Sequence, residues 1–157
     1  MDVYDAFHRS WALVSAGTPE QFNTMTVSWG ELGSLWNKEV ATVFVRPNRF
    51  TFEYMESNDY FTISFYPPEK REALKILGTI SGRDTDKVTI SGLHPIPCEE
   101  SVSFKEATTT LLCKKIYRQD LDYEQFPEDI KKRFYSDEPA HRMYIGEIIR
   151  VLKGNHE

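Results

Sequence analysis

A polar run that ends in a tryptophan, Asn23-Thr24-Met25-Thr26-Val27-Ser28-Trp29, has the composition of a ligand-binding strand. Amide and hydroxyl side chains stand where a plain core strand would carry aliphatic ones, so a polar group is expected against it. Asn, Thr and Ser donate hydrogen bonds to the carbonyls and ring nitrogens of a flat heterocycle, and an indole offers a face for stacking. A half-exposed strand with its polar side chains in water would show the same pattern.

A second run, Arg46-Pro47-Asn48-Arg49-Phe50-Thr51, falls where a buried strand is expected to pass into a helix. The first turn of a helix presents unpaired N–H groups and a partial positive charge. Two arginines and a threonine hydroxyl beside that turn would suit a monophosphate. Arginines at strand ends also commonly extend into solvent, and that alternative stays open.

Two further stretches carry polar or titratable groups. The run from Ser81 to Lys87, SGRDTDK, is a polar turn whose glycine permits backbone conformations that aim N–H groups at an anion, although an ordinary loop has the same composition. Near the C-terminus, His141 enters an otherwise apolar strand in which Gly146 allows close backbone approach. Such a histidine either packs as a structural group, or meets a cofactor and takes part in proton transfer.

The elements that would position these groups are mostly strands. Segments rich in β-branched and aromatic residues predict seven of them, at residues 11–16, 23–29, 40–45, 60–66, 87–90, 108–117 and 142–152. Turn-forming residues separate them at 17–19, 36–38 and 91–92, so successive strands are expected to fold back antiparallel. A barrel or a sandwich follows from this pattern.

Three stretches predict helices, at residues 49–57, 68–77 and 127–134. In the first, Asn48 is placed as the N-cap, with Phe50, Tyr54 and Ser57 on one stripe. In the second, Pro68 suits the first turn and the buried face is formed by Ala73, Leu74 and Leu77. No linker, repeat or low-complexity tract divides the 157 residues, so a single domain over residues 1–157 is expected.

Composition excludes several classes of protein. The net charge of −5 is spread over both signs without a basic block, which argues against nucleic acid as a partner. Cys98 and Cys113 lack paired CxxC spacing, so we expect structural thiols and no metal site. The dinucleotide, P-loop, zincin and hydrolase motifs are missing. The chain has no signal-like or membrane-length apolar run, which predicts a soluble, cytoplasmic protein away from membranes.

Taken in order, five stretches resemble the flavin reductase-like family of FMN-binding split barrels. They are the NTMTVSW strand, the RPNRFTFEYM junction, the YFTISFYP strand, the SGRDTDK turn and the HRMYIGEI strand, and the resemblance runs nearly end to end. It implies a mainly β fold: an antiparallel, Greek-key-like split barrel with a few short flanking helices, working as a homodimer with FMN near the interface.

The resemblance also implies roles for individual residues. Asn23, Thr24, Met25, Thr26, Ser28 and Trp29 would line the ring and ribityl side of FMN. Arg46, Pro47, Arg49, Thr51, Ser81, Gly82, Arg83 and Lys87 would belong to the phosphate side. His141 matches a histidine that lies near the nicotinamide or the flavin in relatives with Gly-Asp-His before the last strand; here Pro139 and Ala140 replace the Gly-Asp pair.

The resemblance leaves three candidate functions open. The first is an NAD(P)H:flavin oxidoreductase, because hydride transfer from NADH or NADPH to a flavin requires stacking and alignment more than a protein acid or base. One flavin face must then stay open, so Trp29 and Trp36 are not expected to cap both. The second is a flavoredoxin-type carrier that keeps FMN and exchanges electrons with a protein partner. The third is a flavin- or small-ligand-binding module without redox turnover. A related split barrel oxidises pyridoxine phosphate, but the NTMTVSW and HRMYIGEI pair points away from that substrate.

Overall fold

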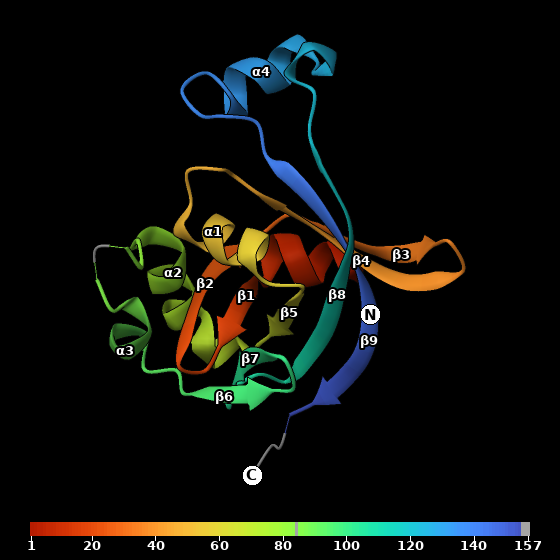
Figure 1. The fold of residues 1–157 in the computed structure, drawn as a ribbon. Helices are drawn as coiled ribbons and strands as arrows, with labels where there is room; N and C mark the ends of the chain where they lie inside the picture. The colour runs from red at the N-terminus through yellow and green to blue at the C-terminus, as the bar shows by residue number, and fades with distance from the viewer. Residues whose placement is uncertain (84, 155–157) are drawn as a thin grey trace.

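The computed structural model describes residues 1–83 and 85–154, and its main feature is a curved antiparallel sheet of seven strands (Figure 1). In spatial order these are β2 (Gln21–Val27), β1 (Ala12–Thr18), β5 (Tyr60–Phe65), β8 (Thr109–Asp120), β9 (Arg142–Lys153), β4 (Lys38–Val45) and β3 (Gly30–Leu35). A separate hairpin, β6 (Pro95–Cys98) with β7 (Ser101–Phe104), packs against β1 and β5. The expected mainly β, antiparallel architecture is confirmed.

The sheet is split between two strands that are neighbours in the sequence. β2 and β3 form its opposite edges, yet only Ser28 and Trp29 join them. Because two residues span only a few ångströms, the two edges must meet at this link. The sheet therefore curls into a barrel whose two edges are connected through the Ser28–Trp29 link. Among the described residues, no hydrogen-bonded ladder pairs β2 with β3.

The core has two parts, one on each face of β1. Val14 faces a cluster inside the barrel that also contains Val43, Met55 and Phe61. The neighbouring Leu13 faces a second cluster, which contains Leu74, Leu77 and Phe104. Successive side chains of a strand point to opposite faces, so a strand buried on both faces reads as a continuous apolar run. This explains the uninterrupted run at the start of β1.

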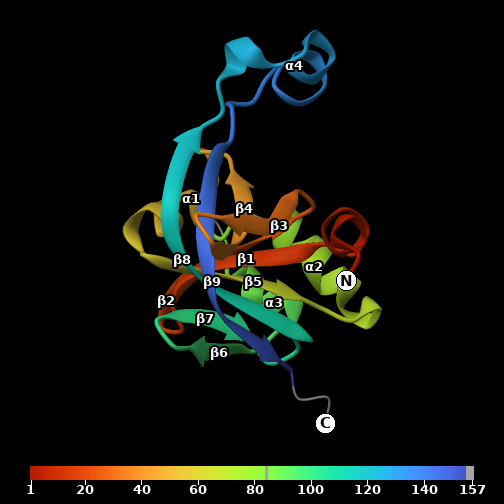
Figure 2. The ribbon, with the colours of Figure 1, turned by 90° about the vertical axis from the view of Figure 1, so that its right-hand side faces the viewer.

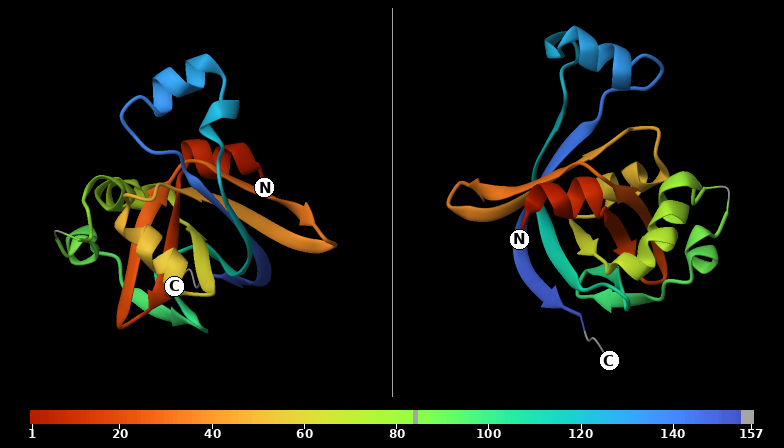
Figure 3. Two further views of the ribbon diagram at one scale, coloured as in Figure 1. Left: turned by 45° about the horizontal axis from the view of Figure 1, so that its top comes forward. Right: turned by 180° about the vertical axis from the view of Figure 1, so that it is seen from behind.

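The helices lie close to the predicted ranges: α1 (Phe50–Ser57), α2 (Arg71–Thr79) after a 3-10 turn η2 (Pro68–Lys70), and α4 (Glu128–Phe134) after η3 (Tyr123–Gln125). The buried face of α2 is formed by Ala73, Leu74 and Leu77, as predicted. A short π-type helix, η1 (Asp5–Arg9), was not predicted. α1 and α2 both pack against the free edge strand β2 (Figures 1 and 3).

Two predictions about α1 are wrong. Arg49, not Asn48, is the N-cap, and it caps through its extended backbone without a side-chain hydrogen bond. Asn48 lies in the preceding loop, where its amide donates to Glu138 Oε2 at 2.8 Å. The side chains that α1 buries are Thr51 and Met55, four residues apart, because the helix rests on the barrel through that face. The predicted stripe is therefore rotated away from the core.

The strand predicted at residues 87–90 is also wrong, because this stretch forms α3 (Lys87–Ser91). Asp86 caps the helix by accepting from the backbone N–H of Thr89, and Gly92 ends it with φ of +78°. These two caps outweigh the strand preference of the β-branched side chains. The short strands β3, β6 and β7 were not predicted: β3 is poor in β-branched residues, and β6 contains two prolines, which occur in strands mainly at edges.

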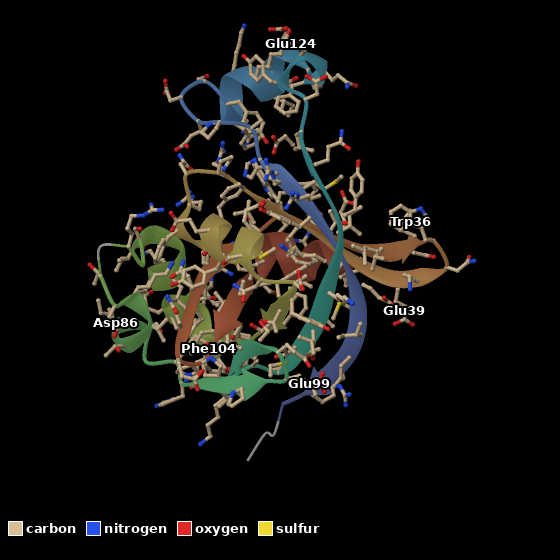
Figure 4. The ribbon with its side chains drawn as sticks, in the orientation of Figure 1. Trp36, Glu39, Asp86, Glu99, Phe104 and Glu124 are labelled. Carbon is tan, nitrogen blue, oxygen red and sulfur yellow. The ribbon has the colours of Figure 1, made fainter. Side chains whose placement is uncertain are left out.

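Two parts of the chain project from the barrel. β8 and β9 extend beyond it and carry η3 and α4 away from the other helices (Figures 1 and 2). The β3–β4 hairpin projects separately, with Trp36 near its tip (Figure 4). Trp36 and Asn37 have φ of +53° and +60°, as a two-residue type I′ turn requires, which confirms the turn predicted at residues 36–38. Among the described residues, no helix has the length and apolarity to cross a membrane.

Candidate functional site

Two neighbouring cavities follow the free edge of β2. The first, which we call the Lys87 cavity, has a volume of about 130 Å³ and is lined by Asn23, Met25, Thr26, Asn48, Arg49, Phe50, Thr51, Leu77, Gly78, Ile80, Ser81, Gly82 and Lys87. The second, the Trp29 cavity, measures about 190 Å³ and is lined by Met25, Thr26, Val27, Ser28, Trp29, Phe44, Arg46, Arg49 and His141. Met25, Thr26 and Arg49 line both, so the cavities adjoin along the strand.

The Lys87 cavity lies where the first turn of α1 faces the last turn of α2. Asn23 reaches from β2 to this turn, and its amide donates to Thr51 Oγ1 at 2.8 Å. Both side chains are buried, so this bond ties the edge strand to the helix N-terminus. The first N–H groups of α1 and the positive end of its dipole therefore lie beside the polar strand, as anion binding requires.

Lys87 is the most unusual residue of the site because its side chain is only 4% exposed. Its ammonium donates to the carbonyl of Leu77 at 3.1 Å and has no carboxylate partner among the described residues. Burial, and secondarily the positive charge of Arg49, lowers the pKa of Lys87 to about 8. A buried cation without a counter-charge, close to a second cation, is an arrangement that an anion stabilises.

Gly82 contributes in a different way from the one predicted. The φ angle of Gly82 is not positive. The glycine-specific backbone conformation that was expected to aim N–H groups at an anion is therefore not present at this residue. Instead it packs on Asn23, and a Cβ at this position would stand 2.2 Å from Asn23 Oδ1. The glycine is therefore required for the close approach of the 81–83 turn to β2. Asp84, in the same motif, lies outside the described residues.

The Trp29 cavity is walled by aromatic rings. Trp29 lies edge-on to Phe134, with ring centroids 5.0 Å apart, and tilted against His141 at 5.2 Å. Its 36% exposure leaves part of the indole open to the cavity and to solvent. Trp36 takes no part, because it projects on the β3–β4 hairpin and packs on Tyr117 (Figure 4). Within this chain, a flat ligand in the Trp29 cavity would meet one tryptophan only.

His141 is buried, and its Nδ1 lies 2.8 Å from the hydroxyl of Tyr135. Burial is the main cause that lowers the pKa of His141 to about 4, and Arg46 and Arg49 add to it. The imidazole is therefore neutral at physiological pH. A neutral ring offers one donor or one acceptor at Nε2, which suits hydrogen bonding to a ligand in the cavity better than acid catalysis.

Arg46 lines the Trp29 cavity but also holds the loop that follows α4. Its guanidinium donates to the carbonyls of Pro139 at 2.9 Å and Phe134 at 3.1 Å, and lies over the ring of Tyr135. The base of the α4 segment is thus fixed to the wall of the cavity. Gly146, in β9, packs on Phe61, where a Cβ would stand 2.7 Å from the ring, so the predicted close approach is present.

Three predicted site residues lie outside both cavities. Thr24 is fully buried against β1, where its hydroxyl meets Ser15 Oγ at 2.8 Å. Pro47 is exposed and lines neither cavity. Arg83 turns outward to Glu53, with 3.2 Å between Nη2 and Oε1. Thr24 is covered by its cross-strand partner Ser15 in β1, and no local pattern predicts the direction of a loop arginine.

Sequence reasoning missed two contributors. Tyr135, which orients His141, lies six residues before it across an irregular loop, and that spacing has no recognisable signal. Asn48, which was predicted only as the N-cap of α1, lines the Lys87 cavity. The two thiols, Cys98 and Cys113, are buried and free, and burial raises the pKa of Cys98 to about 11, in keeping with structural cysteines.

Comparisons with known proteins agree with this geometry. The model of the flavin reductase like domain matches residues 4–157. The structure is similar to a flavoredoxin from Methanosarcina acetivorans, with a TM-score of 0.74 and 20% identity over 93% of this chain and 69% of the other. It is also similar to an FMN-binding protein from Thermus thermophilus crystallised with 1-cyclohex-2-enone, with a TM-score of 0.73 and 18% identity over 94% and 73% of the two chains.

A further solved structure shares the fold: a putative flavin reductase with split barrel domain from Shewanella frigidimarina. The TM-score is 0.73 and the identity 19%, over 94% of this chain and 68% of that chain. No curated protein matches the sequence. The family model covers almost the whole chain, and the fold is shared with that split-barrel neighbour. The chain therefore belongs to the flavin reductase like domain family.

Proposed function

We propose that this chain binds FMN along the free edge of β2 and transfers a hydride from NADH or NADPH to it. The observation that carries the proposal is the buried ammonium of Lys87, which has Arg49 beside it and no carboxylate partner among the described residues. The family of the chain and the FMN-binding neighbour in the comparisons support the same cofactor.

The residues of the Lys87 cavity fit the phosphate of FMN. Lys87 and Arg49 supply the positive charge, and the N–H groups at the start of α1 supply further donors. The hydroxyl of Ser81 lies on the same wall. Each charge-assisted hydrogen bond contributes about 1.5–3 kcal/mol, so two or three of them would anchor the ligand.

The residues of the Trp29 cavity fit the other end of the ligand. Trp29 presents an aromatic face, and Met25, Thr26 and Ser28 line the strand edge below it. β2 is the sheet edge, so its outward backbone groups are free to pair with ring carbonyls and nitrogens. FMN, when bound, supplies the two-electron redox chemistry that the side chains themselves lack.

The protein contributes alignment rather than proton transfer in this scheme. A neutral His141, held by Tyr135, directs one ring nitrogen toward a ligand and does not repel a cationic nicotinamide product. Trp29 covers one face only, so the other face is open to the nicotinamide. Hydride transfer then depends on stacking distance and orientation.

The site also supports the proposed homodimer. The two cavities together have a volume at the lower end of the 300–1,000 Å³ that ligand sites typically enclose. Trp36 is 60% exposed and Tyr117 39%, and the two rings lie 6.4 Å apart on the projecting part of the chain. A second copy that covers these rings would bury apolar surface that now faces solvent. The cytoplasm stays the proposed location, and two free thiols are compatible with it.

The test is an absorbance titration of the purified protein with FMN, followed by anaerobic addition of NADH and, separately, NADPH. The proposal expects a stoichiometric shift of the flavin band on binding and its bleaching by at least one nucleotide. A protein that binds no FMN would contradict the whole site assignment. Sedimentation of wild-type protein and of Trp36→Lys tests the dimer, which the variant should weaken.

A flavoredoxin-type electron carrier is the second candidate, and the likeness to the Methanosarcina flavoredoxin favours it. Pro139 and Ala140 replace the Gly-Asp pair of relatives whose histidine lies near the nicotinamide. A carrier would bind FMN in the same cavities but would resist both nucleotides, while a reduced protein donor would bleach it. The same anaerobic experiment therefore separates the carrier from the reductase.

A further inference from the structure

A third and larger opening borders the Lys87 cavity on the side away from Trp29. We call it the Tyr54 groove; its volume is about 850 Å³, and it runs between α1, the β1–β2 turn and α3. Asn23, Phe50, Gly82 and Lys87 line both the groove and the Lys87 cavity. The border between them is therefore formed by residues of β2, α1, the turn at Gly82 and the first residue of α3. The proposed function uses none of the remaining groove.

The walls of the groove carry aromatic rings suited to a planar heterocycle. Phe22 contributes from β2, and Phe50 and Tyr54 from α1. The rings of Phe50 and Tyr54 stand edge to face, with centroids 5.3 Å apart, and form an aromatic pair along one wall of the groove. On α1 these two side chains lie beside the buried Thr51 and Met55; Tyr54 packs partly against the barrel core and also lines the groove.

The charges at the border suit a second phosphate. Arg83 lines the groove, lies over the ring of Phe50 at 4.9 Å and pairs with Glu53 at 3.2 Å. Both partners of that ion pair are about half exposed, so the pair is weak and can be exchanged for another anion. Lys87 lies on the other side of the border and reaches both openings.

We propose that the Tyr54 groove binds the adenylyl half of FAD, so that this chain prefers FAD to FMN. The inference rests on the proposed function, which places the flavin ring in the Trp29 cavity and its phosphate in the Lys87 cavity. In FAD the order of groups is ring, ribityl chain, first phosphate, second phosphate and adenosine. The order of the three openings along the molecule is the same, with Lys87 and Arg83 at the position of the diphosphate.

The geometry favours FAD over the adenylyl half of the nicotinamide donor. A nicotinamide must stack on the flavin ring in the Trp29 cavity, at the far end of the site from the Tyr54 groove. The second phosphate of FAD, by contrast, is bonded directly to the first. The groove thus continues the flavin chain from the place where FMN ends.

The experiment compares the dissociation constants of FMN, FAD and riboflavin for the wild type, Tyr54→Ala, Tyr54→Phe and a control, Tyr123→Ala, by fluorescence titration. Tyr54 lines only the groove, and Tyr123 is an exposed tyrosine on η3 that lines none of these openings. We expect the wild type to bind FAD about tenfold more tightly than FMN, through one stacked ring and one further charge-assisted bond. Tyr54→Ala should remove most of this preference and leave FMN unchanged, whereas Tyr54→Phe and Tyr123→Ala should keep it.

Each outcome bears on the inference. Unchanged FMN binding by Tyr54→Ala also shows that the variant is folded, so a loss confined to FAD supports the groove. Equal affinity of the wild type for FMN and FAD overturns the inference while the proposed function stands. An FAD preference that survives in Tyr54→Ala overturns it too. If AMP binds and is displaced by NADH but not by FAD, the groove belongs to the nucleotide donor and the inference is wrong. If no flavin binds at all, the proposed function itself has failed.

Discussion

Replacing Lys87 with methionine should weaken FMN binding and stabilise the ligand-free protein at the same time. Burial lowers the pKa of Lys87 from 10.5 to about 8, so the unfolded chain holds the proton more strongly than the folded one. The penalty is fully present below pH 8, and stability rises with pH between pH 8 and 10.5 as the folded protein deprotonates first. After allowance for partial solvent screening, the penalty at pH 7 is about 2 kcal/mol.

Methionine removes the buried charge but also the hydrogen bond to the carbonyl of Leu77, which contributes about 1 kcal/mol. The net gain is therefore about 1 kcal/mol, or a rise in Tm of about 2–4 °C for a chain of this size. The same change removes a charge-assisted bond to the phosphate, so FMN affinity should fall about 10- to 150-fold. Riboflavin, which has no phosphate, should bind the variant and the wild type equally.

Fluorescence titrations with FMN and riboflavin, together with thermal melts of the ligand-free proteins, test this prediction. In the wild type, FMN affinity should decrease above pH 8 as Lys87 loses its proton, and this decrease should be missing in Lys87→Met. Lys75→Met, at an exposed position on α2, is the matched control and should leave both ligands unaffected. Equal losses for FMN and riboflavin, or a lower Tm for Lys87→Met, would refute the anion-site reasoning.

Further predictions concern the same site. Arg49→Ala should weaken FMN binding about tenfold or more with little change in Tm, because it removes an exposed phosphate partner and no core volume; unchanged affinity would place the phosphate elsewhere. Gly82→Ala should cost about 1–3 kcal/mol of stability, since the new Cβ would overlap Asn23 Oδ1, and a wild-type thermal melt would contradict the close packing. NMR of labelled histidine should show His141 neutral from pH 5 to 8 and mixed ring tautomers in Tyr135→Phe; titration of His141 near pH 6.5 in the wild type would disprove its burial.

The parts of the site that could be predicted from sequence are those held together by local geometry. Residues 23–27 lie in one strand, and Ser28 and Trp29 follow directly in the link to β3, so their side chains stay close together wherever the strand packs. The 46–51 junction likewise follows directly on the end of β4 and leads within four residues into the first turn of α1. Within such stretches, residue spacing determines which side chains lie together, although Thr24 is kept out of the cavities by its contact with Ser15 on β1.

The parts that could not be predicted depend on tertiary contacts. The β-branched residues after Lys87 predict a strand, whereas the caps at Asp86 and Gly92 end a short helix on either side. The helix that forms instead turns the lysine inward beneath α2. The partnership of Tyr135 with His141 depends on how Arg46 holds the intervening loop, and no single segment contains that information.

The two-residue link at Ser28 and Trp29 has a consequence for local dynamics. Because no ladder joins β2 to β3 among the described residues, the edge of β2 depends on α1 and α2 for its protection from solvent. Local opening between β2 and β3 should therefore require the least free energy in the native state. Backbone amides of β2 should exchange with deuterium earlier than those of the central strands β5 and β8. A ligand bound along the unpaired edge of β2 would take the place of a neighbouring strand. The residues at which it slows amide exchange would identify the backbone groups that it contacts.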